Sequence, residues 1–225
     1  MNITCNICGA ENTQYAFSKN NYDLYYCNNC KTLITDITED DYNEMISTFP
    51  LHELNENSAA RNTIYGNEIR IRRCLPYLYR NFIPTTNFVD YGCGEGQLVD
   101  LAKDYFQNAV GVDIVYYKRN KTVYPTLDSL PEFVLPIHCL TMVEVIEHLY
   151  NPKQAVTEIY QYLADSAIIY LESSFINPDC IDKNWEYIRP PVHITYLSEY
   201  TLYNYIFNDF RNIHKLNDNV YIIVK

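Results

Sequence analysis

An acid, a glycine-rich turn and a second acid about twenty residues later could together bind a cofactor. An apolar run ends in residues 89–96, Val-Asp-Tyr-Gly-Cys-Gly-Glu-Gly, and a second apolar run ends in Gly111-Val112-Asp113. The first run predicts a buried strand, and the glycines predict a turn where a ligand can approach backbone N–H groups. Gln97 to Phe106 then predicts a helix. Asp113 ends the next strand, where a carboxylate can accept hydrogen bonds from both hydroxyls of a ribose.

The position of the first acid distinguishes between nucleotide cofactors. A dinucleotide-binding turn reads G-x-G-x-x-G and accommodates a pyrophosphate. Here Asp90 stands two residues before Gly92, where it would repel a pyrophosphate and could help to hold an ammonium group. The preferred ligand is therefore an adenosine that carries a cationic amino acid. A glycine turn in another kind of α/β protein is the alternative.

This motif resembles that of class I S-adenosylmethionine-dependent methyltransferases, from about Phe88 to the C-terminus. The resemblance implies an α/β fold with a Rossmann-like seven-stranded methyltransferase sheet whose last strand is antiparallel, and S-adenosylmethionine as cofactor. Asp128, after the third strand, would reach the adenine amino group; a solvated loop acid is the other interpretation. The predicted cofactor-binding residues are Asp90, Gly92, Cys93, Gly94, Gly96, Asp113, Ile114, Asp128 and Val143.

Length and charge limit the remaining possibilities. A chain of 225 residues can hold one α/β core and a small appendage. We expect a zinc ribbon in residues 1–38, a helical linker or lid in 39–80 and the methyltransferase domain in 81–225. No segment has the length or pattern of a membrane span or secretory signal, so a cytoplasmic location is expected. The net charge of −11 disfavours a broad nucleic-acid surface.

Four cysteines near the N-terminus have the spacing of a zinc site. Cys5 and Cys8 form one C-x-x-C pair, and Cys27 and Cys30 form a second. Four thiolates close the coordination shell, so the ion would be structural. The ribbon either recognises or docks the substrate, or it caps a segment too short to build a core. It is similar to ribbons that precede the catalytic domain in methyltransferases of sugars and other small metabolites.

The helices expected after the ribbon could cover the cofactor. We expect an acidic linker and helices over Thr38–Pro50 and Ser58–Tyr79. Three side chains there are candidates for a lid and cannot be ranked from the sequence: Tyr65, Arg70 and Arg72.

A second group of polar residues follows the strand expected at Ile137–Thr141. If the next segment is helical, Glu144, Glu147 and His148 share one face. With His193 they could surround a divalent ion that polarises a substrate hydroxyl. Without a metal, His148 or His193 could remove the proton directly. The predicted catalytic residues are Glu147, His148 and His193; a histidine satisfied within the core is the alternative for each.

The stretch Thr141–His148 is similar to one in ubiquinone-pathway O-methyltransferases and small-RNA 3′-terminal 2′-O-methyltransferases. This resemblance implies a metal held by Glu144, Glu147 and His148, with His193 matching a downstream histidine of the RNA group. Mixed oxygen and nitrogen ligands suit Mn²⁺ better than Mg²⁺. The same Glu-His pair also occurs in ribbon-bearing sugar methyltransferases without need of a metal. Trp185 and Tyr187 could form an aromatic wall for the acceptor or could be packing residues.

The rest of the chain departs from the family pattern at two places. Ile137-His138 replaces the usual Phe-Asp, and residues 163–166 replace a glycine-rich turn. Beyond them we expect a strand at Ala167–Glu172, a helix at Glu199–Asn208 and a closing hairpin of Phe210–Lys215 and Val220–Val224.

Together these features predict methyl transfer from S-adenosylmethionine to a hydroxyl of a sugar, nucleotide-sugar or other small molecule. Metal-dependent 2′-O-methylation of an RNA end is the first alternative. A non-catalytic interaction module is the second. The sequence does not indicate an oligomeric state.

Overall fold

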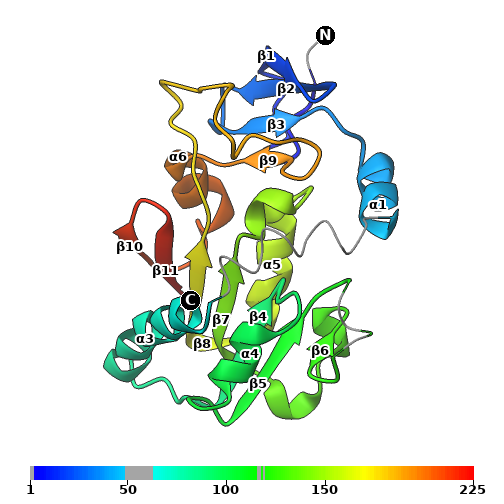
Figure 1. Cartoon of the computed structure of the whole chain (residues 1–225). Helices are drawn as coiled ribbons and strands as arrows, with labels where there is room; N and C mark the ends of the chain where they lie inside the picture. The colour runs from blue at the N-terminus through cyan, green and yellow to red at the C-terminus, as the bar shows by residue number, and fades with distance from the viewer. Residues whose placement is uncertain (1–2, 49–62, 116–117, 119) are drawn as a thin grey trace. The chain divides into compact units, whose positions relative to one another are not determined.

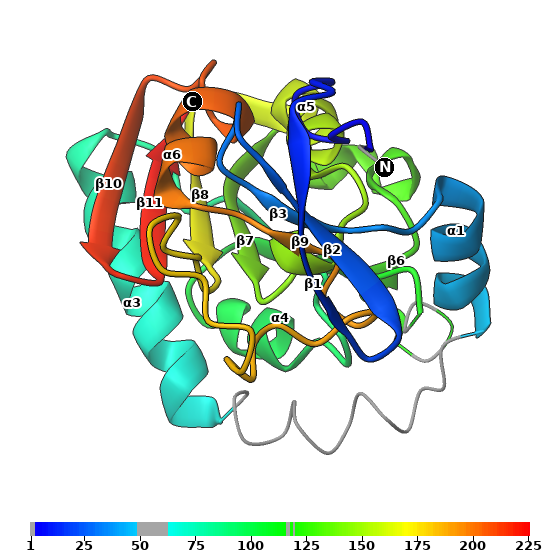
Figure 2. The same ribbon diagram turned by 90° about the horizontal axis from the view of Figure 1, so that it is seen from above.

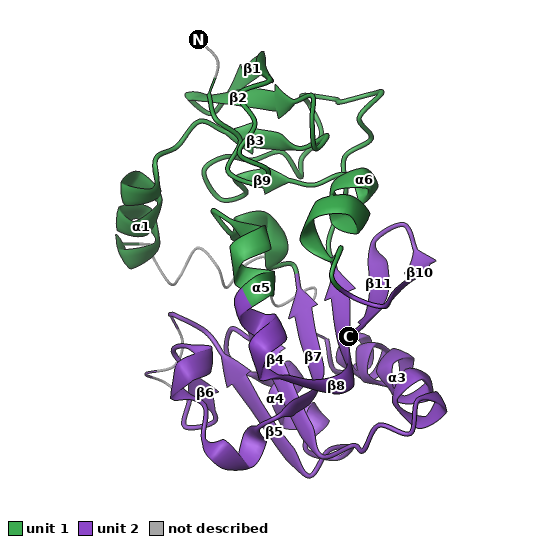
Figure 3. Cartoon of the chain, turned by 180° about the vertical axis from the view of Figure 1, so that it is seen from behind, with its two compact units in different colours: residues 1–49, 144–157, 173–209 green, residues 50–143, 158–172, 210–225 purple. Residues whose placement is uncertain are grey.

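The computed structural model describes residues 3–48, 63–115, 118 and 120–225. The chain forms two compact units, shown in Figure 3, each assembled from segments that are distant in sequence. Unit 1 comprises residues 1–49, 144–157 and 173–209, and unit 2 comprises residues 50–143, 158–172 and 210–225. The prediction divided the chain into three consecutive parts. The two compact units do not coincide with these three parts. The predicted boundaries at residues 38 and 80 remain a prediction.

Unit 2 is built on a seven-stranded sheet with strand order β10-β11-β8-β7-β4-β5-β6 (Figure 1). The five strands from β4 to β8 run parallel, and β11 is antiparallel to both of its neighbours. The predicted α/β fold, with a Rossmann-like seven-stranded sheet and an antiparallel last strand, is therefore confirmed. The strands are β4 (Asn87–Tyr91), β5 (Asn108–Val112), β6 (Val123–Tyr124), β7 (Ile137–Val143), β8 (Leu163–Glu172), β10 (Asn212–Asn217) and β11 (Val220–Val224).

Helices α3 (Ile64–Arg80) and α4 (Gln97–Ala102) pack together against this sheet. Thr63 caps α3 by accepting a 3.0 Å hydrogen bond from the Gly66 N–H. The predicted helix to Phe106 is wrong at its end, because the chain leaves α4 after Ala102 and the Phe106 ring packs on Phe88, with ring centroids 5.0 Å apart. Of the helix expected at Ser58–Tyr79, the first residues lie outside the described part of the chain.

Unit 1 contains a four-stranded antiparallel sheet of order β1-β2-β3-β9, which Figure 2 shows from above. Asn20 and Asn21 join β1 to β2 and both have positive φ, at 53° and 66°, as a tight hairpin turn requires. Strand β2 ends at Cys27, the first residue of the second cysteine pair. The strands are β1 (Thr13–Lys19), β2 (Tyr22–Cys27), β3 (Leu33–Thr35) and β9 (Thr195–Tyr196).

Several predicted elements differ in detail. The helix expected at Glu199–Asn208 is one turn of α-helix, α6 (Glu199–Thr201), followed by a π-helix at Leu202–Ile206. Residues 163–166 are not a loop but begin β8, whose pairing with β7 shifts register before Ile168. The remaining helices are α1 (Glu39–Thr48), α5 (Pro152–Tyr162), and 3₁₀ turns at Leu127–Ser129, Glu132–Val134 and Ile146–His148. None of the helices within the described ranges could span a membrane.

Candidate functional site

The glycine-rich turn and Asp113 lie in direct contact within unit 2. The Gly94 N–H donates a 3.0 Å hydrogen bond to Asp113 Oδ2, and the Val115 N–H donates one of 2.8 Å to Oδ1. Gly94 has φ of +53° and Gly96 has φ of +88°, and a Cβ on Gly96 would lie 2.8 Å from Asn120 Nδ2. A side chain is disfavoured at both positions, so the turn keeps its backbone accessible beside the carboxylate.

Cys93 turns its side chain into the core of unit 2. Burial raises the pKa of this thiol, and the nearby charges of Asp90 and Asp113 act in the same direction. A Cβ on Gly111 would lie 2.2 Å from Cys93 Sγ, which explains why a glycine stands there. Cys93 is therefore not a reactive thiolate, and a ligand could contact only its backbone.

Asp90 is buried near the end of β4. Its Oδ1 accepts a 2.6 Å hydrogen bond from the hydroxyl of Thr141. Burial raises the pKa of Asp90 to about 7, and the charge of Asp113 adds to the effect, whereas the Thr141 hydrogen bond and the charge of Arg70 oppose it. A buried carboxyl with this pKa can change its charge when a cation arrives near neutral pH.

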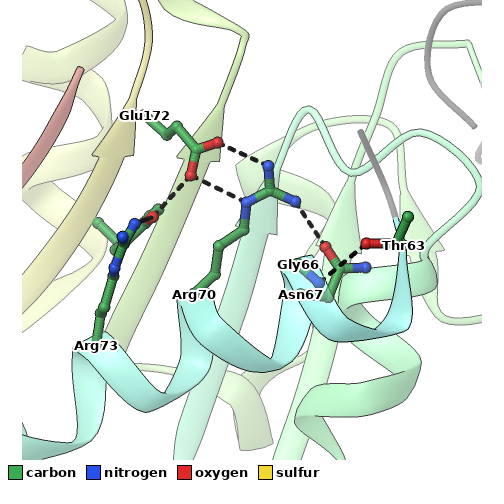
Figure 4. Close-up of polar contacts among 7 residues, drawn as sticks. Thr63, Gly66, Asn67, Arg70, Arg73 and Glu172 are labelled. Carbon is green, nitrogen blue, oxygen red and sulfur yellow. Dashed lines mark hydrogen bonds and ion pairs between the residues drawn. The ribbon is translucent and has the colours of Figure 1, made fainter. Parts of the chain in front are cut away.

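Arg70 is the centre of a polar network between α3 and the end of β8 (Figure 4). Its Nε and Nη2 atoms donate to the two carboxylate oxygens of Glu172 at 3.0 and 2.7 Å, and Nη1 donates to Asn67 Oδ1 at 2.8 Å. Tyr170 also donates to Glu172, at 2.7 Å, and Arg73 donates to the Tyr170 hydroxyl at 3.2 Å. This bidentate pairing holds a buried guanidinium in one orientation.

The other two lid candidates differ from Arg70. Tyr65 is exposed, and Arg72 forms an exposed ion pair with Glu68 one helical turn away. Arg70 is the only one of the three that is buried. Sequence reasoning missed its partner Glu172, since 102 residues separate the two and no local pattern links them.

The remaining predicted cofactor residues lie at the ends of other strands of unit 2. Ile114 follows Asp113 and is 55% exposed. Asp128 lies in a 3₁₀ turn, and its carboxylate accepts a hydrogen bond from the Tyr162 hydroxyl. Val143 ends β7 beside Glu172 of β8. Their contact with a cofactor remains a prediction.

The four N-terminal cysteines form one cluster in unit 1. The Sγ atoms of Cys5 and Cys30 are 3.6 Å apart, as are those of Cys8 and Cys27, and all four sulfurs lie within 4.8 Å of one another. Tetrahedral coordination at about 2.3 Å would place sulfurs roughly 3.8 Å apart. The cluster therefore fits a Zn²⁺ ion.

Glu147, His148 and His193 form a second cluster in unit 1, with one ligand atom from each within 4.8 Å of the others. Glu147 is buried; its Oε2 accepts a 2.9 Å hydrogen bond from Ser173, while its Oε1 has no hydrogen-bond partner among the described residues. Burial raises the pKa of Glu147, against hydrogen bonds that include those to Ser173 and Glu144.

Both histidines of this cluster are fixed by backbone carbonyls. His148 Nδ1 lies 2.7 Å from the carbonyl oxygen of Val192, and His193 Nδ1 lies 2.7 Å from that of Tyr187. Because a carbonyl only accepts, each Nδ1 must carry the proton, which leaves the lone pair of a neutral ring on Nε2. The Nε2 of His193 accepts hydrogen bonds from Arg189, at 3.2 Å from Nη2 and 3.4 Å from Nε. The sequence did not point to Arg189 or Ser173, because neither belongs to a motif or to a periodic pattern of residues.

The segment after β7 is a loop rather than a helix, the two forms that the sequence left open, so Glu144, Glu147 and His148 do not share a helical face. Glu144 has φ of +54° directly after β7, and only a 3₁₀ turn at Ile146–His148 follows. Glu147 and His148 nevertheless lie beside His193, and the neighbouring Ile194 N–H donates to the Glu147 carbonyl at 3.0 Å.

Comparison with known proteins identifies the family. Residues 65–208 match the family described as methyltransferase domain, so the chain belongs to this family and is an S-adenosylmethionine-dependent methyltransferase. No curated protein matches the sequence of the chain.

Solved structures of methyltransferases are similar to the chain. One similar structure is the 1,6-didemethyltoxoflavin-N1-methyltransferase of Burkholderia thailandensis with bound 1,6-didemethyltoxoflavin and S-adenosylhomocysteine. It is 9% identical with a TM-score of 0.53, and the match covers 94% of this chain and 97% of that one. Another is the N-methyltransferase NodS of Bradyrhizobium japonicum with S-adenosylhomocysteine. It is 11% identical with a TM-score of 0.47, and the match covers 82% of this chain and 95% of that one. At these identities the likeness concerns the fold alone.

Proposed function

We propose that this methyltransferase acts on a hydroxyl oxygen of a sugar, nucleotide-sugar or other small molecule, in the cytoplasm. The state of His148 carries this proposal. Its Nδ1 proton is held by the Val192 carbonyl, so Nε2 is the nitrogen that can take up a proton from the acceptor hydroxyl. S-adenosylmethionine supplies the methyl group, with the new O–C bond forming as the C–S bond breaks. His148 removes the proton that the oxygen loses.

The cofactor-binding residues have separate roles in this proposal. Asp113 accepts hydrogen bonds from the ribose hydroxyls, and Asp90 holds the ammonium group of the amino-acid part. The backbone from Gly92 to Gly96, including Cys93 and Gly94, approaches the ligand closely. Ile114 and Val143 contact its apolar atoms, and Asp128 reaches the adenine amino group.

The acceptor is recognised by the loop before His193. Trp185 is stacked on the buried Tyr187, with ring centroids 4.9 Å apart, and the half-buried Trp185 ring suits the face of a sugar or a base. Arg189 is half-buried, and its guanidinium lies on a neutral histidine nitrogen rather than on a carboxylate; among the described residues no acid lies within ion-pair distance of it. A cation without an acidic partner favours an anionic acceptor, such as the diphosphate of a nucleotide-sugar.

The second candidate is metal-dependent 2′-O-methylation of an RNA end. Its support is the buried Glu147 Oε1 atom without a hydrogen bond, next to His148 and His193, with Glu144 nearby as the fourth predicted ligand. The donor set of oxygen and nitrogen suits Mn²⁺ better than Mg²⁺. The Arg189 contact opposes this candidate, since a guanidinium occupies the Nε2 lone pair that His193 would give to the ion.

We also propose that Cys5, Cys8, Cys27 and Cys30 hold a structural Zn²⁺. Four thiolates leave no open coordination position, so this ion would stabilise the fold without touching the acceptor. Metal analysis of the purified chain should find one zinc per protein, and replacing Cys8 by Ser should lower that content.

Methyl transfer from radiolabelled S-adenosylmethionine tests the proposed function. Nucleotide-sugars, free sugars and short RNAs would be offered in parallel, once with EDTA and once with Mn²⁺. We expect label in a nucleotide-sugar in both conditions. His148→Asn should lose transfer while retaining S-adenosylhomocysteine binding, and His138→Asn serves as the matched control. Labelling of RNA alone, and only with Mn²⁺, would favour the second candidate.

A further inference from the structure

The cysteine-rich sheet and the loop that carries Tyr187 share one hydrophobic core in unit 1. Strands β2 and β3 contribute Leu24 and Leu33, and the later part of the chain contributes the rest of the cluster. Its buried members are Leu24, Leu33, Ile176, Tyr187, Ile188 and Tyr196. Trp185 packs against this cluster from the edge. A ribbon that docked a partner independently would not need to share its core with this loop.

The tip of the β1–β2 hairpin is also tied to the loop by hydrogen bonds. Lys19 Nζ donates to the carbonyls of Lys183 and Trp185 at 2.9 and 3.0 Å. Asn20 Nδ2 donates to the carbonyl of Pro190 at 3.0 Å. Three backbone carbonyls of the segment 183–190 are therefore held by two adjacent residues at the hairpin tip.

A second connection runs from β3 to the Glu147 cluster. The Thr35 N–H donates to the Ile194 carbonyl at 2.9 Å, and the Ile194 N–H in turn donates to the Glu147 carbonyl at 3.0 Å. The Thr195 hydroxyl donates to the Leu149 carbonyl at 2.9 Å. The segment that carries His193 is thus placed between the ribbon sheet and the loop that carries Glu147 and His148.

The cysteine cluster itself is joined to the same body. The hydroxyl of Thr201 donates to the Cys30 carbonyl at 2.6 Å and lies 3.0 Å from the hydroxyl of Thr32. All three groups are buried. Loosening the second cysteine pair would therefore disturb α6 as well as β3.

We infer that the ribbon is a positioning element for the acceptor-binding residues, with Lys19 and Asn20 as positioning residues that fix the segment 183–190. That these residues bind the acceptor rests on the proposed function, whereas the placement of Trp185, Tyr187 and Arg189 by the hairpin does not. Lys19 donates to backbone carbonyls of this segment and so influences an acceptor through the loop. Loss of these contacts should loosen the loop and leave the S-adenosylmethionine site in unit 2 unchanged.

Trp185 is the single tryptophan of the chain, so its fluorescence reports on this loop directly. Lys19→Met removes both hydrogen bonds and retains an unbranched apolar side chain. Lys183→Met is the matched control, because it keeps the carbonyl that Lys19 binds while changing an exposed side chain. We expect the population of the open loop to rise roughly tenfold in Lys19→Met, since charge-assisted hydrogen bonds are lost. Acrylamide quenching of Trp185 should increase, whereas S-adenosylhomocysteine affinity should stay within about twofold of the wild type.

Two further variants keep the test decisive if Lys19→Met folds poorly. Asn20→Gly removes the amide but tolerates the positive φ, and should increase quenching to a smaller extent. Lys19→Arg retains a donor and should restore much of the wild-type protection. Equal quenching in wild type, Lys19→Met and Lys183→Met would overturn the inference. If instead the fluorescence changes as expected but no hydroxyl acceptor is methylated, the proposed function fails and the positioning role stands.

Discussion

The affinity for S-adenosylhomocysteine should rise as the pH is raised from 6 to 8. The ligand carries an ammonium group, and in the proposed site this group lies at Asp90. Burial raises the pKa of Asp90 to about 7 in the ligand-free protein. At pH 6 the carboxyl is therefore mostly protonated and cannot offer a charge to the ligand.

The size of the effect follows from this pKa. With a pKa of about 7, roughly one molecule in eleven has an ionised Asp90 at pH 6 and ten in eleven at pH 8. If only the ionised form binds the ammonium group well, the association constant increases about tenfold, or about 1.4 kcal/mol. Binding at pH 6 should release close to one proton, and binding at pH 8 close to none.

Isothermal titration calorimetry in two buffers with different ionisation enthalpies measures both the affinity and the number of protons released. Asp90→Asn should bind more weakly at pH 8 and lose the pH dependence, because its side chain cannot ionise. An affinity that is independent of pH in the wild type, or that falls with rising pH, would refute the reasoning. So would an unchanged pH dependence in Asp90→Asn.

The raised pKa of Asp90 also affects the stability of the protein, which should fall as the pH rises, whereas the affinity for the ligand rises. The folded-state pKa lies above the unfolded value, so ligand-free stability should decrease as the pH rises from about 4 to about 7, by up to roughly 4 kcal/mol. Urea unfolding at pH 5 and pH 8 should show about 2.6 kcal/mol of this loss, since part of it already occurs below pH 5. Asp90→Asn should be more stable than the wild type at pH 8, and a less stable variant would contradict this assignment.

Three further outcomes are expected. Arg70→Met should destabilise unit 2 by about 3 kcal/mol in urea unfolding, because the half-buried Glu172 carboxylate loses its guanidinium partner and keeps only the Tyr170 hydroxyl; an effect below that of the exposed control Arg72→Met would contradict the role of the pair. Gly111→Ala should cost at least about 2 kcal/mol by overpacking against the Cys93 side chain, and Cys93→Ala should recover part of that loss; additive losses would argue against this contact. Zinc removal by a chelator should lower the melting temperature and increase the quenching of Trp185, and neither should change if the cysteines hold no metal.

The parts of the fold that follow from local patterns were predictable. The apolar run that ends at Asp90, the glycines after it and the apolar run that ends at Asp113 each have a signature within a few residues. The spacing of the four cysteines likewise predicts their cluster. These features account for the sheet of unit 2 and for the turn beside Asp113.

Features that depend on distant partners were not predictable. Strand β9 joins the four-stranded sheet of unit 1 from about 160 residues beyond β3, and its two residues are too few to show which strand they pair with. The Arg189 contact with His193 depends on a loop conformation that no periodicity describes. The sequence left a loop or a helix open after β7; the positive φ of Glu144, which side-chain type alone does not predict, makes this segment a loop.

The measurement that tests the central claim most directly is calorimetric titration of S-adenosylhomocysteine into the wild type, Asp113→Ala and the exposed-acid control Asp100→Asn. We predict one binding site in the wild type and in Asp100→Asn. Asp113→Ala should bind about a hundredfold more weakly, since two charge-assisted hydrogen bonds to the ribose are lost. Absence of binding to the wild type, or equal affinity in Asp113→Ala, would contradict the account of the cofactor site.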